Sequence, residues 1–411
     1  MKLQKQLIIY FGVTGINAVL SFYITSKLTH LISPEDYGRI YLYSSFLILL
    51  APFVSLGTLN IISVEYFKKP KKEYTLYFSN SQILPILSVL SLLIICFVFS
   101  TNLSHFLKVP KVWIYIAPLV VWWIMINDIA LILARSKDKA YLYALFSVGR
   151  NVLEILIVIL LVVAFKHGWQ GRLVGAVSAP MLIGIIALLL FFKWGYFVFI
   201  FRRKLIKSIF ILCLPLIFER LSIFVLTNSD RYFIDHFVKN GTYEVGLYGL
   251  GSQIAQIYFL GLMTLNNVYQ PLVFKNLAQS KENKLDRSSL LFFYIIVFLS
   301  IGIAFAIPII FKLFIGHEFW PAMRYAYYLL IGYFISGVHS LLQPYLMFYQ
   351  KNRYIMSVAL IGMLVSLSGN FILVPKIGAF GSVISCISAY FLMVVADVHY
   401  VKKLYKLKFK R

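Results

Sequence analysis

Charged residues are scarce in this sequence of 411 residues. Only 13% of them are Asp, Glu, Lys or Arg, whereas 61% are hydrophobic and the mean hydropathy is +0.84. This balance excludes an ordinary soluble protein and indicates a polytopic helical membrane protein. Apolar runs of about 20 residues or more also exclude a β-barrel, whose strands alternate over only about ten residues.

Cysteines and enzyme motifs are equally sparse. The three cysteines, Cys96, Cys213 and Cys386, lie within apolar runs, without the spacing of a metal site or a disulfide framework. They are interpreted as inert core thiols. The sequence has no glycine-rich phosphate loop, paired metal ligands or Ser/His/Asp order, so no catalytic residue, metal or cofactor is expected. His339 is the one histidine well inside a predicted span, where a hydrogen-bonded packing role is favoured over a proton relay.

Basic residues far outnumber acidic ones, with 39 Lys and Arg against 15 Asp and Glu and a net charge of +24. Hydrophobicity predicts twelve spans, at residues 7–30, 40–65, 75–99, 112–134, 140–165, 173–192, 208–237, 245–270, 290–313, 323–349, 354–374 and 378–400. Most Lys and Arg fall in the segments on the side of the two termini. The positive-inside rule therefore places both termini in the cytoplasm, and it accounts for the charge without nucleic acid. The N-terminal apolar run lacks a convincing cleavage site and is expected to be the first span.

Two halves are predicted to form separate lobes. Residues 1–200 and 208–411 would each supply six spans, joined by a basic cytoplasmic link at 201–207 and followed by a basic cytoplasmic tail. Gly38 and Gly246 open corresponding spans, and Gly175 and Gly381 recur near the ends of the halves at nearly the same offset. Six spans per half give both halves the same topology, so we expect a parallel repeat about an axis along the membrane normal.

The stretch from Ser208 to Gln270 holds the densest intramembrane polarity. Glu219, Arg220, Asp230 and Arg231 share one arc of its first predicted span. A charge at the bilayer centre costs about 2.5–3.5 kcal/mol, and such residues usually face a cavity or a bundle interior. A neutral stripe on the next predicted span includes Gln253, Gln256 and Asn267. The arc is interpreted as a cavity lining, with interhelical ion pairing as the alternative.

Further polar residues lie in the first half of the chain. Arg150 is about 15 Å deep in the fifth predicted span at 1.5 Å per residue, and Glu154, four residues later, could neutralise it. Asp128 in the fourth span either lines an entrance or pairs with Arg135. Asn17 belongs to a polar stripe on the first span. Cavity lining and packing both remain open for these side chains.

Three motifs in order carry a resemblance to a known family: LISPEDYGRIY near the start, SDRYFI followed by VGLYGLGSQIA at mid-chain, and IGAFGSVIS near the end. Together with the length and the twelve predicted spans, they resemble bacterial polysaccharide repeat-unit flippases of the O-antigen (Wzx) type. These belong to the superfamily of multidrug, oligosaccharidyl-lipid and polysaccharide exporters. The resemblance implies an all-α membrane protein with two six-helix lobes around a central cavity in the bacterial inner membrane.

The resemblance also implies a cargo. It would be an undecaprenyl-diphosphate-linked oligosaccharide, moved to the periplasmic leaflet by alternating access, with its lipid tail in the bilayer. Arg150, Arg220 and Arg231 are the candidate diphosphate ligands, because guanidinium binds phosphate bidentately. Candidate partners are H+ or Na+ as coupling ion, a polysaccharide polymerase and chain-length proteins.

Two other functions stay open. A cation-coupled multidrug extruder of the same superfamily would use Asp128, Glu154 or Glu219 as ion sites, although arginines disfavour cationic drugs. A membrane polysaccharide polymerase or ligase would need a sizeable outer loop, which the predicted topology lacks.

Overall fold

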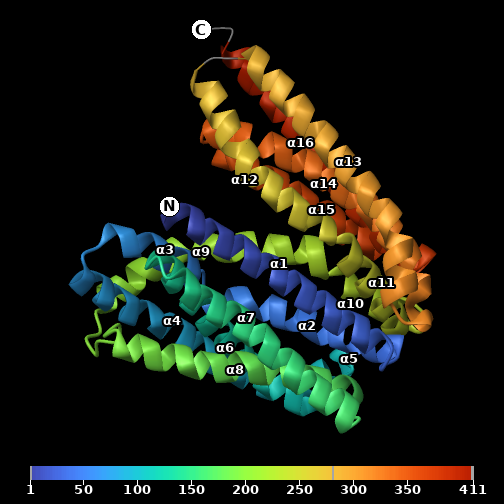
Figure 1. The fold of residues 1–411 in the computed structure, drawn as a ribbon, viewed down its shortest axis with the longest axis horizontal. Helices are drawn as coiled ribbons and strands as arrows, with labels where there is room; N and C mark the ends of the chain where they lie inside the picture. Colours follow the sequence, from blue (N-terminus) through green and yellow to red (C-terminus); the bar gives the residue numbers. More distant parts are fainter. Residues whose placement is uncertain (1, 280–281, 409–411) are drawn as a thin grey trace. The chain divides into compact units, whose positions relative to one another are not determined.

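The computed structural model describes residues 2–279 and 282–408, and over these ranges the chain is α-helical with two short helices of other types and no strand (Figure 1). The elements are α1 (Lys2–Thr29), α2 (Pro34–Ser55), α3 (Thr58–Lys68), α4 (Lys71–Val98), α5 (Ser100–Leu107), α6 (Lys111–Ser136), α7 (Ala140–Ile159), the π-helical η1 (Leu160–Ala164), α8 (Gly168–Lys193), α9 (Arg203–Asn228), α10 (Asp230–Phe237), α11 (Gly241–Ala255), α12 (Ile257–Ala278), α13 (Glu282–Phe314), the 3-10 helix η2 (His317–Ala322), α14 (Met323–Phe348), α15 (Asn352–Ile377) and α16 (Phe380–Lys408). The predicted all-α polytopic fold is confirmed.

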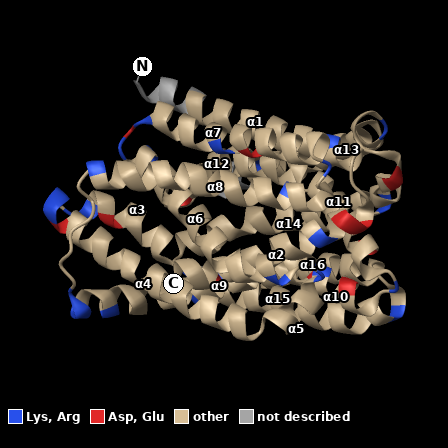
Figure 2. Cartoon of the chain, turned by 90° about the horizontal axis from the view of Figure 1, so that it is seen from below, with Lys and Arg blue, Asp and Glu red and all other residues tan. Residues whose placement is uncertain are grey.

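Eleven helices in the described part are long and apolar enough to cross a membrane. They correspond to eleven of the predicted spans, and most of their charged residues lie near the helix ends (Figure 2). The predicted span 245–270 is not among them; the structure divides it at Gln256 between α11, of 15 residues, and α12, of 22 residues. This interruption also divides the predicted stripe, so that Gln253 and Asn267 belong to different helices.

Local backbone chemistry sets where α2 begins and ends. Its first residue is Pro34, whose fixed φ and missing N–H suit the first turn of a helix. Ser33 caps this turn, because its Oγ accepts the backbone N–H of Asp36 at 3.2 Å. The predicted span 40–65 is not continuous, since Leu56 (φ 45) and Gly57 (φ 75) are left-handed and separate α2 from α3.

The chain divides into two compact units, each described here by itself. Unit 1 comprises Met1–Ile32 and Leu42–Leu221, and unit 2 comprises Ser33–Tyr41 and Ser222–Arg411. The division falls inside α9 and assigns the first turns of α2 to unit 2. The assignment of residues 1–200 and 208–411 to six-helix lobes stays a prediction.

The segment before α9 is bound to unit 1 rather than extended freely. Ser79 of α4 donates to the Tyr196 carbonyl and accepts the N–H of Val198, both at 2.8 Å. Asn80 donates to the carbonyl of Ile200 at 2.9 Å and accepts the N–H of Arg202 at 2.8 Å. Because α9 begins at Arg203, most of the predicted link at 201–207 is already helical.

In unit 2, the start of α2 packs very closely on α11. A Cβ placed on Gly38 would overlap the backbone carbonyl of Thr242, and one on Gly246 would overlap the carbonyl of Pro34. Small residues allow such backbone approach between membrane helices. The two glycines that the sequence places at corresponding positions of the halves therefore lie on helices that contact each other.

Candidate functional site

A neutral polar network joins α1 and α7 in unit 1. Asn17 donates from Nδ2 to Ser147 Oγ at 2.7 Å, and Asn151 donates from Nδ2 to Asn17 Oδ1 at 2.9 Å. Ser147 and Asn151 are four residues apart and so share one face of α7. The structure thus brings Asn17 together with two polar residues of the predicted fifth span, and its role in cargo binding stays a prediction.

Glu154 has a different partner from the expected one. Its Oε1 lies 2.5 Å from the NH1 of Arg172, and both side chains are about one-fifth exposed. The pairing of Glu154 with Arg150, one of the two interpretations left open for these side chains, is therefore replaced by the pair with Arg172. Arg172 reaches it from the first turns of α8 because Gly175 brings that helix against α7, where a Cβ would overlap Val158.

Arg150 belongs instead to a group of arginines around Asp128. The guanidinium groups of Arg135, Arg150 and Arg220 all act electrostatically on the carboxylate of Asp128, which lies on α6. They come from the end of α6, from α7 and from α9. None of them forms an ion pair within 4 Å in the part of the chain that the structure describes. We call Asp128, Arg135, Arg150 and Arg220 the arginine cluster; it contains three guanidinium groups and one carboxyl group.

The predicted charged arc at 219–231 is not one helical face. α9 ends at Asn228 and α10 begins at Asp230, and the unit boundary also separates Arg220 from Arg231. Glu219 is exposed on α9. The α-helix is interrupted at Ser229, so a projection at 100° per residue does not extend across it.

Asp230 and Arg231 form hydrogen bonds and a ring contact with other residues of unit 2. Asp230 accepts the hydroxyl of Tyr248 at 2.5 Å and the backbone N–H of Arg231 at 2.9 Å. Arg231 is 7% exposed, and its guanidinium carbon lies 4.9 Å from the ring centroid of Tyr41. The Tyr41 hydroxyl in turn donates to Gln253 Oε1 at 2.5 Å. These contacts bury the Arg231 head group against protein, while its assignment as a diphosphate ligand remains untested.

The other two residues of the predicted neutral stripe, Gln256 and Asn267, have different surroundings in the structure. Gln256 donates to Ser252 Oγ at 2.9 Å and to the Tyr333 hydroxyl at 3.4 Å. Asn267 is exposed on α12. Of the two, only Gln256 therefore joins a buried hydrogen-bond network.

Sequence reasoning missed one carboxylate. Asp397 on α16 has a fully buried side chain, and its Oδ2 lies 2.5 Å from Nδ1 of His339 on α14. The available signal was the position of Asp397 inside the predicted span 378–400, since intramembrane acids are rare. The hydrogen-bonded role expected for His339 agrees with this contact.

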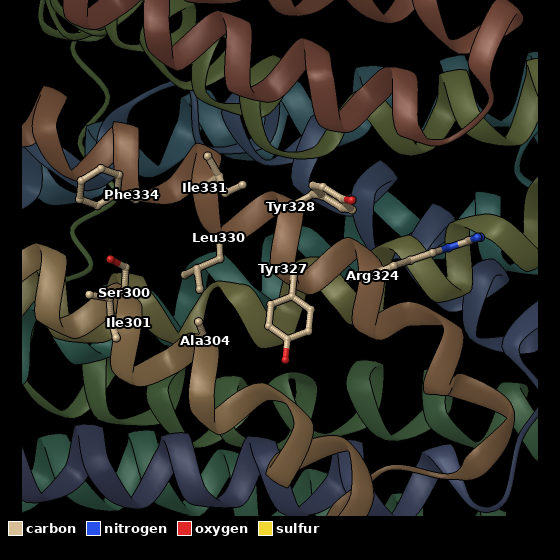
Figure 3. Close-up of a pocket in the computed structure, with 9 residues that line it drawn as sticks. All are labelled: Ser300, Ile301, Ala304, Arg324, Tyr327, Tyr328, Leu330, Ile331 and Phe334. Carbon is tan, nitrogen blue, oxygen red and sulfur yellow. The ribbon is translucent and has the colours of Figure 1, made fainter.

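An apolar pocket of about 670 Å³ lies between α13 and α14 in unit 2 (Figure 3). Its lining is Ser300, Ile301, Ala304, Arg324, Tyr327, Tyr328, Leu330, Ile331 and Phe334. None of the predicted site residues contributes to it. Such a surface suits hydrocarbon better than a sugar or a diphosphate.

The long apolar helices define a multi-span membrane protein, and solved structures share its fold. An inward-facing multidrug resistance transporter of the MATE family is 14% identical with a TM-score of 0.76, covering 95% of this chain and 96% of that one. The lipid II flippase MurJ in an inward closed conformation is 14% identical with a TM-score of 0.71, covering 96% and 87%. At these identities the likeness establishes the fold.

The chain belongs to the family described as polysaccharide biosynthesis proteins, whose family model matches residues 3–277. The MatE family model matches residues 215–372. Protein 1 of the Lsg locus of Haemophilus influenzae is 22% identical over 371 residues, covering 86% of this chain and 87% of that protein. Family and fold confirm the resemblance to flippases of the exporter superfamily.

Proposed function

We propose that this chain is a flippase for undecaprenyl-diphosphate-linked oligosaccharide repeat units, which it moves from the cytoplasmic to the periplasmic leaflet of the bacterial inner membrane. The family membership supports work in polysaccharide biosynthesis, and the fold supports transport by alternating access. Both termini would be cytoplasmic. The product would then pass to a polysaccharide polymerase and its chain-length proteins.

The arginine cluster is the observation that carries this proposal. A diphosphate that joins a lipid to a sugar bears about one negative charge per phosphate, and the cluster offers three guanidinium groups to such an anion. Arginine suits this cargo because its planar guanidinium can donate two parallel hydrogen bonds to phosphate oxygens. Charge-assisted hydrogen bonds of this kind contribute about 1.5–3 kcal/mol each.

Two further features support a sugar-linked anion. The network of Asn17, Ser147 and Asn151 offers amide and hydroxyl groups for sugar hydroxyls on α1 and α7, next to Arg150 in sequence. The membrane potential, negative inside, assists outward movement of an anion by about 2.3 kcal/mol per charge per 100 mV. The hydrocarbon tail stays in the bilayer.

A cation-coupled multidrug extruder is the second candidate. The MatE match over residues 215–372 favours it. However, of the acids predicted for that function, Glu154 is paired with Arg172, and Asp128 stands among arginines. The positive charges of these arginines would repel a cationic drug, so we rank the flippase first.

The test uses a deletion strain complemented with wild type or with Arg220→Ala. Wild type should restore surface polysaccharide, and Arg220→Ala should leave the undecaprenyl-linked unit accumulated in the membrane at normal protein level. Arg203→Ala, at the exposed start of the same helix, is the matched control and should behave as wild type. Normal polymer with Arg220→Ala would refute the cargo site. Intact polymer in the deletion strain together with dye sensitivity would favour the extruder.

A further inference from the structure

The apolar pocket between α13 and α14 has no role in the function proposed above. Its lining follows one face of α14, from Arg324 through Tyr327, Tyr328 and Ile331 to Phe334. Phe334 lies ten positions after Arg324, which corresponds to about 15 Å of helix at 1.5 Å per residue. The hydrocarbon core of a bilayer is about 30 Å thick. The pocket is therefore as long as one leaflet is deep.

The deep end of the pocket is apolar. Ile331 and Phe334 of α14 lie there, opposite Ser300 of α13 (Figure 3). The Ser300 hydroxyl donates to the backbone carbonyls of Ile296 and Val297 at 3.1 and 2.8 Å. Because this hydroxyl is satisfied by its own helix, the deep end presents mainly hydrocarbon to an occupant.

Arg324 marks the opposite end, in the first turn of α14 and so near one membrane surface. Its side chain is 46% exposed, and its guanidinium points away from the apolar lining (Figure 3). NH2 lies 3.5 Å from Glu244 Oε2, and the guanidinium carbon lies 4.8 and 5.4 Å from the ring centroids of Tyr325 and Phe380. Among the described residues, its one hydrogen bond is from NH2 to the Tyr325 hydroxyl at 3.1 Å. Since a guanidinium has five N–H donors, it can bind an anion from outside the protein while these contacts hold it in place.

Two tyrosines separate the cationic end from the apolar end. Tyr327 and Tyr328 lie one turn deeper than Arg324 and are 37% and 48% exposed. The ring of Tyr328 packs on Phe380 with centroids 5.4 Å apart. Tyrosine suits the level of the lipid head groups, because its ring is apolar and its hydroxyl is polar.

The order of cation, tyrosine rings and hydrocarbon matches the order of groups in a glycerophospholipid, which are the phosphate, the glycerol esters and the acyl chain. The volume of about 670 Å³ is that of a small-molecule site, which typically has about 300–1,000 Å³. A sugar would lose its hydration against these walls without gaining hydrogen bonds, which is costly.

We propose that the pocket binds one acyl chain of a glycerophospholipid of the bilayer, with the lipid phosphate hydrogen-bonded to Arg324. Arginine suits this contact because its planar guanidinium can donate two parallel hydrogen bonds to a phosphate. With both termini cytoplasmic, as proposed above, the start of α14 is periplasmic and the lipid belongs to that leaflet. This lipid is not cargo, and its binding does not depend on the flippase function.

The phosphate contact is tested by native mass spectrometry of the full, delipidated chain. Wild type should bind phosphatidylglycerol about tenfold more tightly than diacylglycerol with the same acyl chains, because only the first offers a charge-assisted hydrogen bond. Arg324→Gln combined with Glu244→Gln removes the cation without leaving its carboxylate partner unpaired, and should abolish this preference. Lys376→Gln, which removes an exposed cation at the end of α15, is the matched control and should keep the preference. Equal affinity of wild type for the two lipids would overturn the phosphate contact.

Ala304→Trp tests the apolar part of the site. The added ring would fill the pocket and should weaken binding of both lipids by about tenfold or more, because burial of a few methylene groups contributes that factor. Gly302→Trp is the matched control, since a Cβ at Gly302 has nothing within 4 Å, and it should bind as wild type. Equal binding by the two tryptophan variants would overturn the location.

Two other occupants would be recognised in the same spectra. Undecaprenyl phosphate that binds where phosphatidylglycerol does not, and that Ala304→Trp excludes, would assign the pocket to a polyprenyl chain. A dimer that Ala304→Trp dissociates would assign it to a second copy of this chain. Either result overturns the phospholipid site.

A second measurement needs no variant. Wild type would be reconstituted in liposomes with a phosphatidylglycerol that carries a photoactivatable diazirine at the end of one acyl chain. Crosslinks should concentrate on the deep end of the pocket, at Ser300, Ile301, Ile331 and Phe334. Crosslinks spread evenly over the exposed residues of the other membrane helices would overturn the proposal.

Discussion

The ion pair between Glu154 and Arg172 allows a quantitative test of the packing of α7 on α8. At an effective dielectric constant of 20, unit charges about 4 Å apart attract by about 4 kcal/mol. Both side chains are only about one-fifth exposed, so part of this attraction is offset by lost hydration. We expect a net coupling energy of about 0.5–3 kcal/mol between the two residues, which is the range found for residues in direct contact.

The assay is a double-mutant cycle with Glu154→Gln and Arg172→Gln. Unfolding of the purified protein would be followed in one detergent by tryptophan fluorescence. Each single variant should lose stability, and the double variant should lose less than the sum of the two. A second cycle with Glu154→Gln and Arg150→Gln is the control, and should give a coupling near zero. A larger coupling to Arg150 than to Arg172 would refute the contact.

Two further predictions concern backbone approach and pH. Gly38→Ala should destabilise unit 2 by about 3 kcal/mol or more, because the added methyl group overlaps the backbone carbonyl of Thr242 and overpacking is costly. The control is Gly12→Ala, where a Cβ has nothing within 4 Å, and it should leave the stability unchanged in the same unfolding assay. Equal stability of the two variants would contradict the close packing at Gly38. Lys137 lies beside the ring of Trp194, and burial first, and then the charges of nearby lysines, lower its pKa to about 8. Its positive charge therefore lowers the free energy of unfolding by the full amount below that pH. This destabilisation decreases as the pH rises toward the ordinary lysine pKa of about 10.4. The stability gained by Lys137→Met should therefore shrink from pH 7 to 10, and a gain that does not change with pH would contradict the lowered pKa.

Much of the fold follows from the sequence because bilayer insertion demands long apolar helices with internally bonded backbones. Eleven predicted spans overlap helices, with ends that differ by up to ten residues, as for 40–65 against Pro34–Ser55. The interruptions could not be predicted from hydrophobicity. The left-handed residues Leu56 and Gly57 and the break at Gln256 are local backbone features, which an average of hydropathy over a window does not register.

The candidate site is harder to predict from the sequence, because it also depends on how the helices pack. Helical periodicity correctly places Ser147 and Asn151 on one face, because they share an unbroken helix. It offers Arg150 as one possible partner of Glu154 and does not identify Arg172, because that contact depends on how α8 packs. The sequence does not show the contact of Asp397 with His339, because the two residues are distant in sequence. The contact forms only when α14 and α16 pack together.

The central claim is that the arginine cluster binds a diphosphate-linked cargo. The most direct measurement is the Kd of purified protein for undecaprenyl-diphosphate-linked oligosaccharide by native mass spectrometry, for wild type, Arg150→Ala, Arg220→Ala and the control Arg203→Ala. Loss of one charge-assisted hydrogen bond of about 1.5–3 kcal/mol predicts about 10- to 100-fold weaker binding for the two cluster variants, since 1.4 kcal/mol is tenfold. The control should be unchanged. Equal Kd values for all four proteins would contradict the account.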